Sequence, residues 1–240
     1  MATAFTHRRR PKAKKAAPAD GAMDRWSFRI PASALTLAGF RNWATSEEFP
    51  EHIRVAFLDE EIYLDMSNEE LETHNKVKME IGRLLLNWNR ETQSGTFCGD
   101  GVLLTHEAAS VSNNPDAFFF SHDTLQAGRV RLIPRKNEQG QYIEIEGTPD
   151  WVLEVVSAGS VQKDTVRLRE AYHRAGIAEY WLIDARGEEI HFQILHHRKN
   201  GYAAAPLREG WQRSRVFGRS FRLERRHDAL GLWEYTLYVR

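Results

Sequence analysis

The segment from residue 151 to residue 184 constrains the fold of this chain more than any other part of the sequence. An apolar run, residues 151–156, is followed by a charged stretch with helical character, residues 164–175. That stretch ends at Gly176, a usual residue type at the C-terminus of a helix, and a second apolar run covers residues 177–184. Strand, helix and strand in this order are typical of a parallel crossover, so the sequence predicts an α/β protein.

The remaining patterns predict a mixed α/β sheet flanked by helices, with antiparallel additions. A long amphipathic helix is expected around residues 77–88, with Lys76, Lys78 and Arg83 mostly on its solvent side. A short helix is expected at 33–43, and short strands are expected from 189 to the end. The other predicted strands are 53–58 and 61–66, joined in a hairpin at Asp59-Glu60, then 97–104, 116–120, 130–135 and 142–146, with a hairpin turn at Lys136-Asn137-Glu138-Gln139-Gly140.

Composition predicts a single domain with an N-terminal tail. The chain has 240 residues, of which 42% are hydrophobic, enough for one substantial core. Residues 1–20 hold six of the 33 Lys and Arg but only one of the 33 Asp and Glu, so the rest carries a formal net charge of −5. We therefore expect a disordered basic tail over 1–22 and one folded domain over 23–240. Whether the tail contacts nucleic acid or only aids solubility stays open.

The cysteine and hydropathy patterns predict a cytoplasmic protein. The single Cys98 cannot form an intramolecular disulfide, and no Cys and His residues have the spacing of zinc ligands. These features fit a reducing compartment. No apolar run approaches the roughly 20 residues that span a bilayer, so no membrane partner is expected.

Two carboxylates interrupt apolar strands and are candidates for a metal site. Glu154 lies inside the run 151–156, and Asp116 begins the apolar strand Ala117–Phe120. An isolated buried carboxylate is costly, so Glu154 must face water, pair with a cation or bind a metal. If the two strands pair, both carboxylates converge, and Mg²⁺ or Mn²⁺ prefers such oxygen ligands, with the Val155 carbonyl as a further ligand. Asp150 is a weaker third candidate, because Gly-Thr-Pro-Asp is also ordinary turn chemistry.

A resemblance to a known family indicates which reaction the two carboxylates could serve. The residues that carry it are Pro115-Asp116, the run from Pro149 to Ser157, Asp164, Tyr172, Ala175-Gly176-Ile177 and Glu179 to Asp184, together with His74 and Glu60 to Ser67 upstream. Over about Ala34 to Leu195 the chain resembles the Uma-type restriction endonucleases, the domain of unknown function 820 group. That family belongs to the PD-(D/E)XK nuclease superfamily, whose fold is a mixed sheet flanked by helices. The resemblance implies a Mg²⁺- or Mn²⁺-dependent endonuclease acting on DNA, and cleavage of both strands would suit a homodimer.

The resemblance also assigns residues and exposes a departure. Asp116 and Glu154 would be the two metal-binding acids of the motif. The lysine that normally ends the motif falls at Val156, and the position that replaces it in this family falls at Leu168. Candidate substitutes on the same segment are Lys163, Arg167 and Arg169. Lys163 is the preferred one because it lies near the helix start and has a long flexible reach, whereas an arginine stays protonated and can only stabilise charge. The alternative is that all three cations lie on the solvated outer face of the helix.

Two accessory residues and a second function remain open. His74 could orient a phosphate or touch the metal site, although a histidine on an apolar face is often a core residue. Tyr172 is expected to pack in the core with its hydroxyl near the rim of the site. Because both usual lysine positions are apolar, the alternative to an active enzyme is a nuclease-fold module that only binds nucleic acid or a protein partner.

Overall fold

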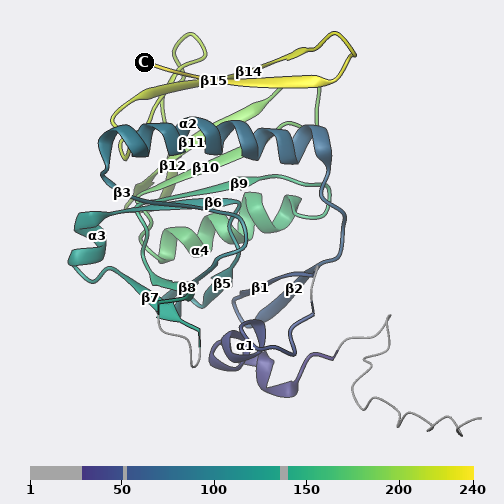
Figure 1. The fold of residues 1–240 in the computed structure, drawn as a ribbon, viewed down its shortest axis with the longest axis vertical. Helices are drawn as coiled ribbons and strands as arrows, with labels where there is room; N and C mark the ends of the chain where they lie inside the picture. The colour runs from purple at the N-terminus through teal and green to yellow at the C-terminus, as the bar shows by residue number, and fades with distance from the viewer. Residues whose placement is uncertain (1–28, 51–52, 136–139) are drawn as a thin grey trace, which may run out of the picture. The chain divides into compact units, whose positions relative to one another are not determined.

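The protein is built around two six-stranded sheets and a smaller third one (Figure 1). The computed structural model describes residues 29–50, 53–135 and 140–240, of which residues 31–240 form one compact unit. The basic tail predicted for residues 1–22 lies outside the described residues. Within them, every helix is too short or too polar to span a lipid bilayer.

The first sheet contains the predicted N-terminal hairpin. Its strands are, in spatial order, β2 (Glu61–Asp65), β1 (Arg54–Leu58), β5 (Val111–Asn113), β4 (Leu103–His106), β8 (Tyr142–Gly147) and β7 (Val130–Pro134). The antiparallel pairing of β1 with β2 confirms that hairpin. Its turn residues Asp59 and Glu60 both have positive φ, 49° and 67°, as a tight two-residue hairpin turn requires. β7 and β8 are also antiparallel, and most of the turn predicted between them, residues 136–139, lies outside the described residues.

The second sheet contains the predicted crossover. Its strands are, in spatial order, β12 (Gly201–Ala204), β11 (His191–Arg198), β10 (Glu179–Asp184), β9 (Trp151–Val155), β6 (Ala117–Ser121) and β3 (Gly95–Gly99). β9 and β10 are parallel, which confirms the crossover, while β6 runs antiparallel to β9. Every residue of β9 is buried, as expected of a central strand covered on both faces.

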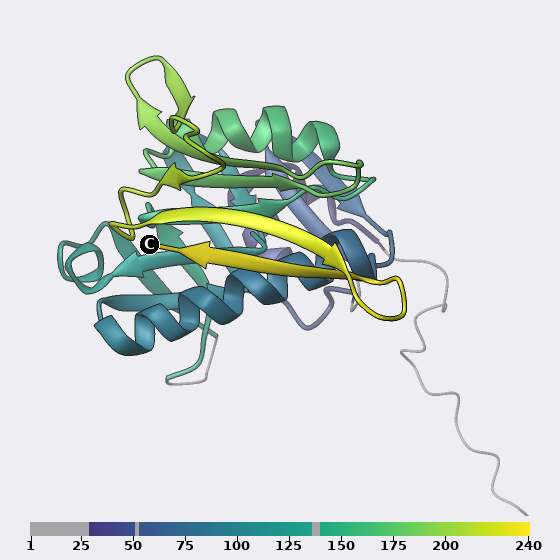
Figure 2. The ribbon, with the colours of Figure 1, turned by 90° about the horizontal axis from the view of Figure 1, so that it is seen from above.

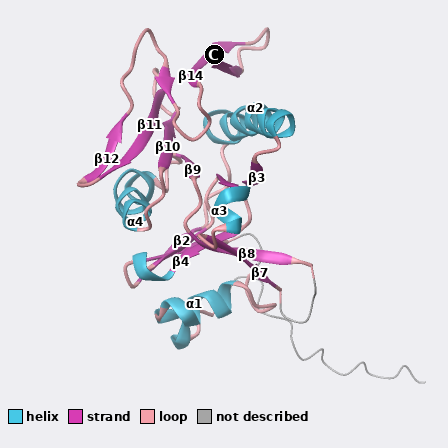
Figure 3. Cartoon of the chain, turned by 90° about the vertical axis from the view of Figure 1, so that its left-hand side faces the viewer, coloured by secondary structure: helices cyan, strands magenta, loops and turns pink. Residues whose placement is uncertain are grey.

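Helices and a third sheet cover the two faces of this second sheet. One face packs against α2 (Lys76–Thr92) and against the sheet of β13 (Gln212–Arg213), β14 (Ser220–His227) and β15 (Trp233–Val239). Figure 2 shows the hairpin of β14 and β15 on this side of the sheet, with β15 next to α2. The opposite face packs against α4 (Arg169–Arg174), which lies across the sheet from α2 (Figure 3). A short helix, α3 (His122–Gln126), follows β6.

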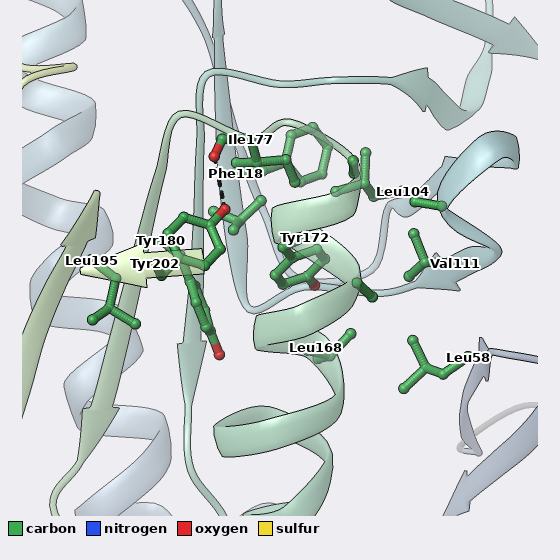
Figure 4. Packing of buried hydrophobic residues seen from close by; sticks show 14 of the residues in the cluster. Leu58, Leu104, Val111, Phe118, Leu168, Tyr172, Ile177, Tyr180, Leu195 and Tyr202 are labelled. Atoms are coloured by element: carbon green, nitrogen blue, oxygen red, sulfur yellow. Dashed lines mark hydrogen bonds between the residues drawn. The ribbon is translucent and has the colours of Figure 1, made fainter. Parts of the chain in front are cut away.

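The largest apolar cluster surrounds α4 and joins the two main sheets. Leu168 and Tyr172 from this helical segment meet Phe118 and Tyr180 from the second sheet, and they meet Leu58 and Val111 from the first (Figure 4). Burial of a side chain such as Leu168 contributes about 1.5–3 kcal/mol. The cluster therefore ties the second sheet to the hairpin sheet through one helix face.

Four predicted elements differ from the structure. The strand expected over 97–104 is two strands in different sheets, because the chain turns at Gly101 with a φ of 97°. The helix expected over 33–43 is a 3-10 turn (Ala32–Leu35) followed by α1 (Leu37–Ala44), since the Thr36 side chain caps the second piece. The helices around 77 and 164 both begin with π-helical turns, at Leu71–Asn75 and Lys163–Leu168.

Candidate active site

The adjoining ends of β6 and β9 bring Asp116 and Glu154 together. Side chains alternate along β9, so Glu154 shares the α4 face of the sheet with Val152, while Leu153 and Val155 point to the α2 face. The register pairs Ala117 with Leu153, and one further step places residue 116 opposite residue 154. The Val155 amide donates a 2.7 Å hydrogen bond to Asp116 Oδ2, and both carboxylates line one pocket.

Neutral donors hold the Glu154 carboxylate in place. Glu154 is 2% exposed, and its Oε1 accepts hydrogen bonds from the Tyr172 hydroxyl at 2.6 Å and from Asn113 Nδ2 at 3.0 Å. Asn113 also donates to the Tyr172 hydroxyl at 2.9 Å. Burial raises the pKa of Glu154 well above its usual range; nearby Lys163 lowers it, and the neighbouring carboxylates of Asp164 and Asp116 raise it further.

Lys163 lies in the same pocket as the two carboxylates. Its side chain is 17% exposed, and its Nζ lies 2.6 Å from Asp164 Oδ1, an ion pair rather than an aligned hydrogen bond. Burial lowers the pKa of Lys163, but the carboxylates of Glu154, Asp164 and Asp116 outweigh it, so the pKa is raised overall. Lys163 is therefore an ammonium ion at neutral pH when no metal is bound.

The two positions at which the family resemblance places a lysine are filled with buried apolar side chains. Val156 and Leu168 are both 0% exposed and belong to the core around α4. Arg167 does not line the pocket; it pairs with Glu61 at 2.6 Å and lies over the Tyr63 ring. Arg169 donates to the carbonyl of Tyr202. Of the cations proposed on this segment, the structure brings Lys163 to the carboxylates.

His74 and Lys78 approach Asp116 from α2 and the turn before it. His74 is 3% exposed, and its Nε2 lies 3.6 Å from Asp116 Oδ2. Lys78 Nζ lies 3.4 Å from Asp116 Oδ1, and its side chain is only 10% exposed. The prediction that Lys78 faces solvent is therefore wrong. Its spacing from His74, Ile81 and Leu85 is that of one buried helical stripe, and this spacing could have revealed it.

Asp150 lies elsewhere than the sequence suggested, and Asn113 has a role that the sequence analysis did not predict. Asp150 lies outside the pocket and accepts hydrogen bonds from the Ser121 amide at 2.7 Å, from the Thr124 hydroxyl and from Arg129. It therefore anchors the start of α3 to the strand ends. Asn113 was not singled out by sequence, although it holds Glu154, and its position beside Asn114-Pro115-Asp116 was the available signal.

The oxygen atoms of the pocket fit a hard divalent cation. Asp116 and Glu154 supply carboxylates, and Asn114 Oδ1, from another residue of the pocket wall, is buried without a hydrogen-bond partner among the described residues. Mg²⁺ and Mn²⁺ favour such oxygen donors and keep several waters. Within residues 29–50, 53–135 and 140–240, no three His, Cys, Asp or Glu side chains converge as a complete ligand set. Any ion held here would use two carboxylates and other oxygen donors.

Comparison with known proteins places this architecture in a class and then in a family. A crystal structure from Anabaena variabilis ATCC 29413, described as "a putative nuclease belonging to DUF820", is similar with a TM-score of 0.54 at 14% sequence identity, covering 76% of this chain and 90% of that chain. The two mixed sheets and their helices thus form a restriction-endonuclease-like fold, as predicted. The Uma2 family, described as "Putative restriction endonuclease", matches residues 38–224. This chain belongs to that family, which confirms the resemblance seen in the sequence. None of the curated proteins matches it.

Proposed function

We propose that this protein is a divalent-metal-dependent endonuclease that hydrolyses DNA phosphodiester bonds in the pocket between β6 and β9. The observation that carries the proposal is the convergence of Asp116, Glu154 and Lys163 on one pocket. Two carboxylates and one ammonium are the groups that a nuclease of this class needs. Membership of a family described as restriction endonucleases supports a nuclease, with DNA as its substrate.

Asp116 and Glu154 would hold Mg²⁺ or Mn²⁺, with the Val155 carbonyl as a further oxygen ligand. The bound ion would supply Lewis-acid stabilisation of phosphate charge and a more acidic water. The protein holds both carboxylate side chains in fixed orientations through hydrogen bonds. The Val155 amide orients Asp116, while Tyr172 and Asn113 orient Glu154 through one of its oxygens. Hydrogen-bonded ligands of this kind lose little entropy when they bind a cation.

Lys163 would stabilise the negative charge that develops on the phosphate. Because its pKa is raised in the metal-free pocket, it carries a proton at neutral pH and acts first as a fixed positive charge. Lys163 would thus do the work of the motif lysine, whose two usual positions hold Val156 and Leu168 in this chain. His74 faces Asp116 across 3.6 Å and would help to keep that carboxylate aligned.

The test is cleavage of supercoiled plasmid and of labelled oligonucleotides in Mg²⁺ or Mn²⁺. We expect the wild-type chain to cut DNA and Asp116→Asn, Glu154→Gln and Lys163→Met to lose cleavage. Asp123→Asn is the matched control, since Asp123 is an exposed carboxylate outside the pocket. Equal cleavage by Glu154→Gln and wild type would exclude this pocket as the active site. The mass of the protein bound to its DNA site would test the homodimer.

A non-catalytic binding module is the second candidate function. The observation in its favour is the burial of Val156 and Leu168, the two positions at which the family resemblance places a lysine. Salt-dependent binding of DNA by wild-type protein, without cleavage in any divalent metal, would favour this module over the enzyme. Cleavage that requires Lys163 would exclude it.

A further inference from the structure

Lys78 lies at the centre of three carboxylates beside the candidate metal site. Its Nζ lies 2.7 Å from Glu69 Oε1, 2.9 Å from Asp100 Oδ2 and 3.4 Å from Asp116 Oδ1. The three acids come from separate segments: the loop before α2, the turn after β3 and the residue before β6. A single cation thus joins three parts of the chain around the outer side of Asp116.

The two oxygens of Asp116 face different groups. Oδ2 accepts the hydrogen bond from the Val155 amide, next to Glu154, whereas Oδ1 faces the Lys78 ammonium. In two-metal nucleases a carboxylate can bridge two ions that sit about 3.5–4 Å apart. Here the positive charge beside Asp116 Oδ1 is the Lys78 ammonium, which belongs to the protein.

Glu69, one of the three acids around Lys78, is held in its ionised form. Glu69 Oε1 also lies within reach of Asn75 Nδ2 at 3.1 Å and His74 Nδ1 at 3.3 Å. Burial raises the pKa of Glu69, but hydrogen bonds from Lys78 and Asn75 outweigh it and lower the pKa to about 2. Oxygen ligands of full negative charge are what a hard divalent ion prefers. The ammonium is therefore bound by carboxylates, the ligand type that Mg²⁺ and Mn²⁺ prefer.

We infer that the Lys78 ammonium is a built-in cation that takes the place of a second divalent ion beside Asp116. This inference rests on the proposed function, in which Asp116 and Glu154 hold the first ion. It makes Lys78 a positioning residue, because it holds Asp116 and neutralises the acids next to it. The chain then binds a single divalent ion at its active site.

Counting bound Mn²⁺ by calorimetric titration and by electron paramagnetic resonance tests the inference. We expect one Mn²⁺ for wild type and for Lys78→Arg, which keeps the charge. Lys78→Ala should bind one ion more than wild type, and Lys78→Ala/Asp100→Asn should lose that extra ion. Lys76→Ala is the control, since Lys76 lies on the same helix but binds Glu72 and the Trp233 carbonyl outside the pocket; its count should equal that of wild type.

Circular dichroism and a second variant guard against loss of folding. If Lys78→Ala does not fold without metal, Lys78→Gln replaces it, because its amide can still donate to the carboxylates while leaving no fixed charge. A Lys78→Gln chain that is folded and binds no more Mn²⁺ than wild type would overturn the inference. The proposed function is judged separately. If the wild-type protein binds no Mn²⁺, this counts against a metal site at Asp116 and Glu154. That conclusion does not depend on how many more ions Lys78→Ala binds than wild type.

Discussion

The backbone amide of Val155 donates a 2.7 Å hydrogen bond to the carboxylate of Asp116, the residue that lies opposite Glu154 across β6 and β9. This contact makes the Asp116 side chain part of the strand pairing. The orientation of one candidate metal ligand is therefore set by the backbone next to the other. Changes at Asp116 should affect chemistry and stability in separable ways.

Asp116→Asn and Asp116→Ala should both lose cleavage, by on the order of 100-fold or more, since each removes a charge that holds the cation. Their stabilities should differ. Asn keeps an oxygen that can accept from the Val155 amide, whereas Ala leaves that buried donor unpaired at a cost of about 1–3 kcal/mol. Urea denaturation in EDTA measures the difference, and equal stability of the two variants would contradict this role of the hydrogen bond.

Lys163→Met should destabilise the metal-free protein by about 3 kcal/mol at neutral pH, because it leaves the buried carboxylates of Glu154 and Asp164 without their cation. The loss should shrink in Mn²⁺, which restores positive charge to the pocket. Thermal unfolding with and without Mn²⁺ gives the comparison. Lys199→Met, a change at an exposed lysine outside the pocket, serves as the control. A Lys163→Met chain as stable as wild type in EDTA would show that Lys163 does not neutralise these acids.

Leu168→Lys should not restore a motif lysine. Leu168 is 0% exposed within the core around α4, so a charged group there lacks both water and a partner, at a cost of about 3 kcal/mol or more. We expect the double variant Lys163→Met/Leu168→Lys to be less stable than Lys163→Met and equally unable to cleave DNA. Recovery of cleavage in the double variant would mean that position 168 can reach the pocket.

Asp150 should contribute to stability at neutral pH and lose that contribution in acid. Burial raises its pKa, but the Ser121 amide, the Thr124 hydroxyl and Arg129 lower it below its usual value overall. A carboxyl group with a lowered pKa in the folded state stabilises the protein above its unfolded pKa of about 3.9, and this is lost as the pH falls through the folded pKa.

Asp150→Asn tests this pH dependence directly. The variant should be about 1–3 kcal/mol less stable than wild type at pH 7, since a neutral amide would replace a charged acceptor of several hydrogen bonds. This difference in the free energy of unfolding between wild type and variant should become smaller as the pH falls below about 4. Urea denaturation at several pH values between about 7 and about 2 measures it, and a gap that stays constant over this range would exclude Asp150 as the titrating group.

Local patterns in the sequence predicted much of the fold and the two acids of the site. Apolar runs around a glycine-terminated helix indicated the β9–α4–β10 crossover, and single carboxylates in apolar strands indicated Asp116 and Glu154. These signals are local because strand and helix periodicity are properties of short segments. The prediction of one strand over residues 97–104 was wrong because periodicity is local. Both halves have the pattern of a strand, and only the strands they pair with separate them into β3 and β4.

The identity of the groups around the acids depended on contacts between distant segments. Side-chain chemistry favoured Lys163 over Arg167, but only the structure shows that the start of the helical segment directs Lys163 into the pocket and Arg167 toward Glu61. Lysine is usually a surface residue, but Lys78 is buried because Glu69, Asp100 and Asp116, from three other segments, surround its ammonium group. Sequence alone was thus sufficient to recognise the crossover, most of the strands and the two carboxylates that share the pocket. The choice of cations beside those carboxylates came from the packing of the sheets and helices, because the energy of a buried charge is set by neighbours remote along the chain.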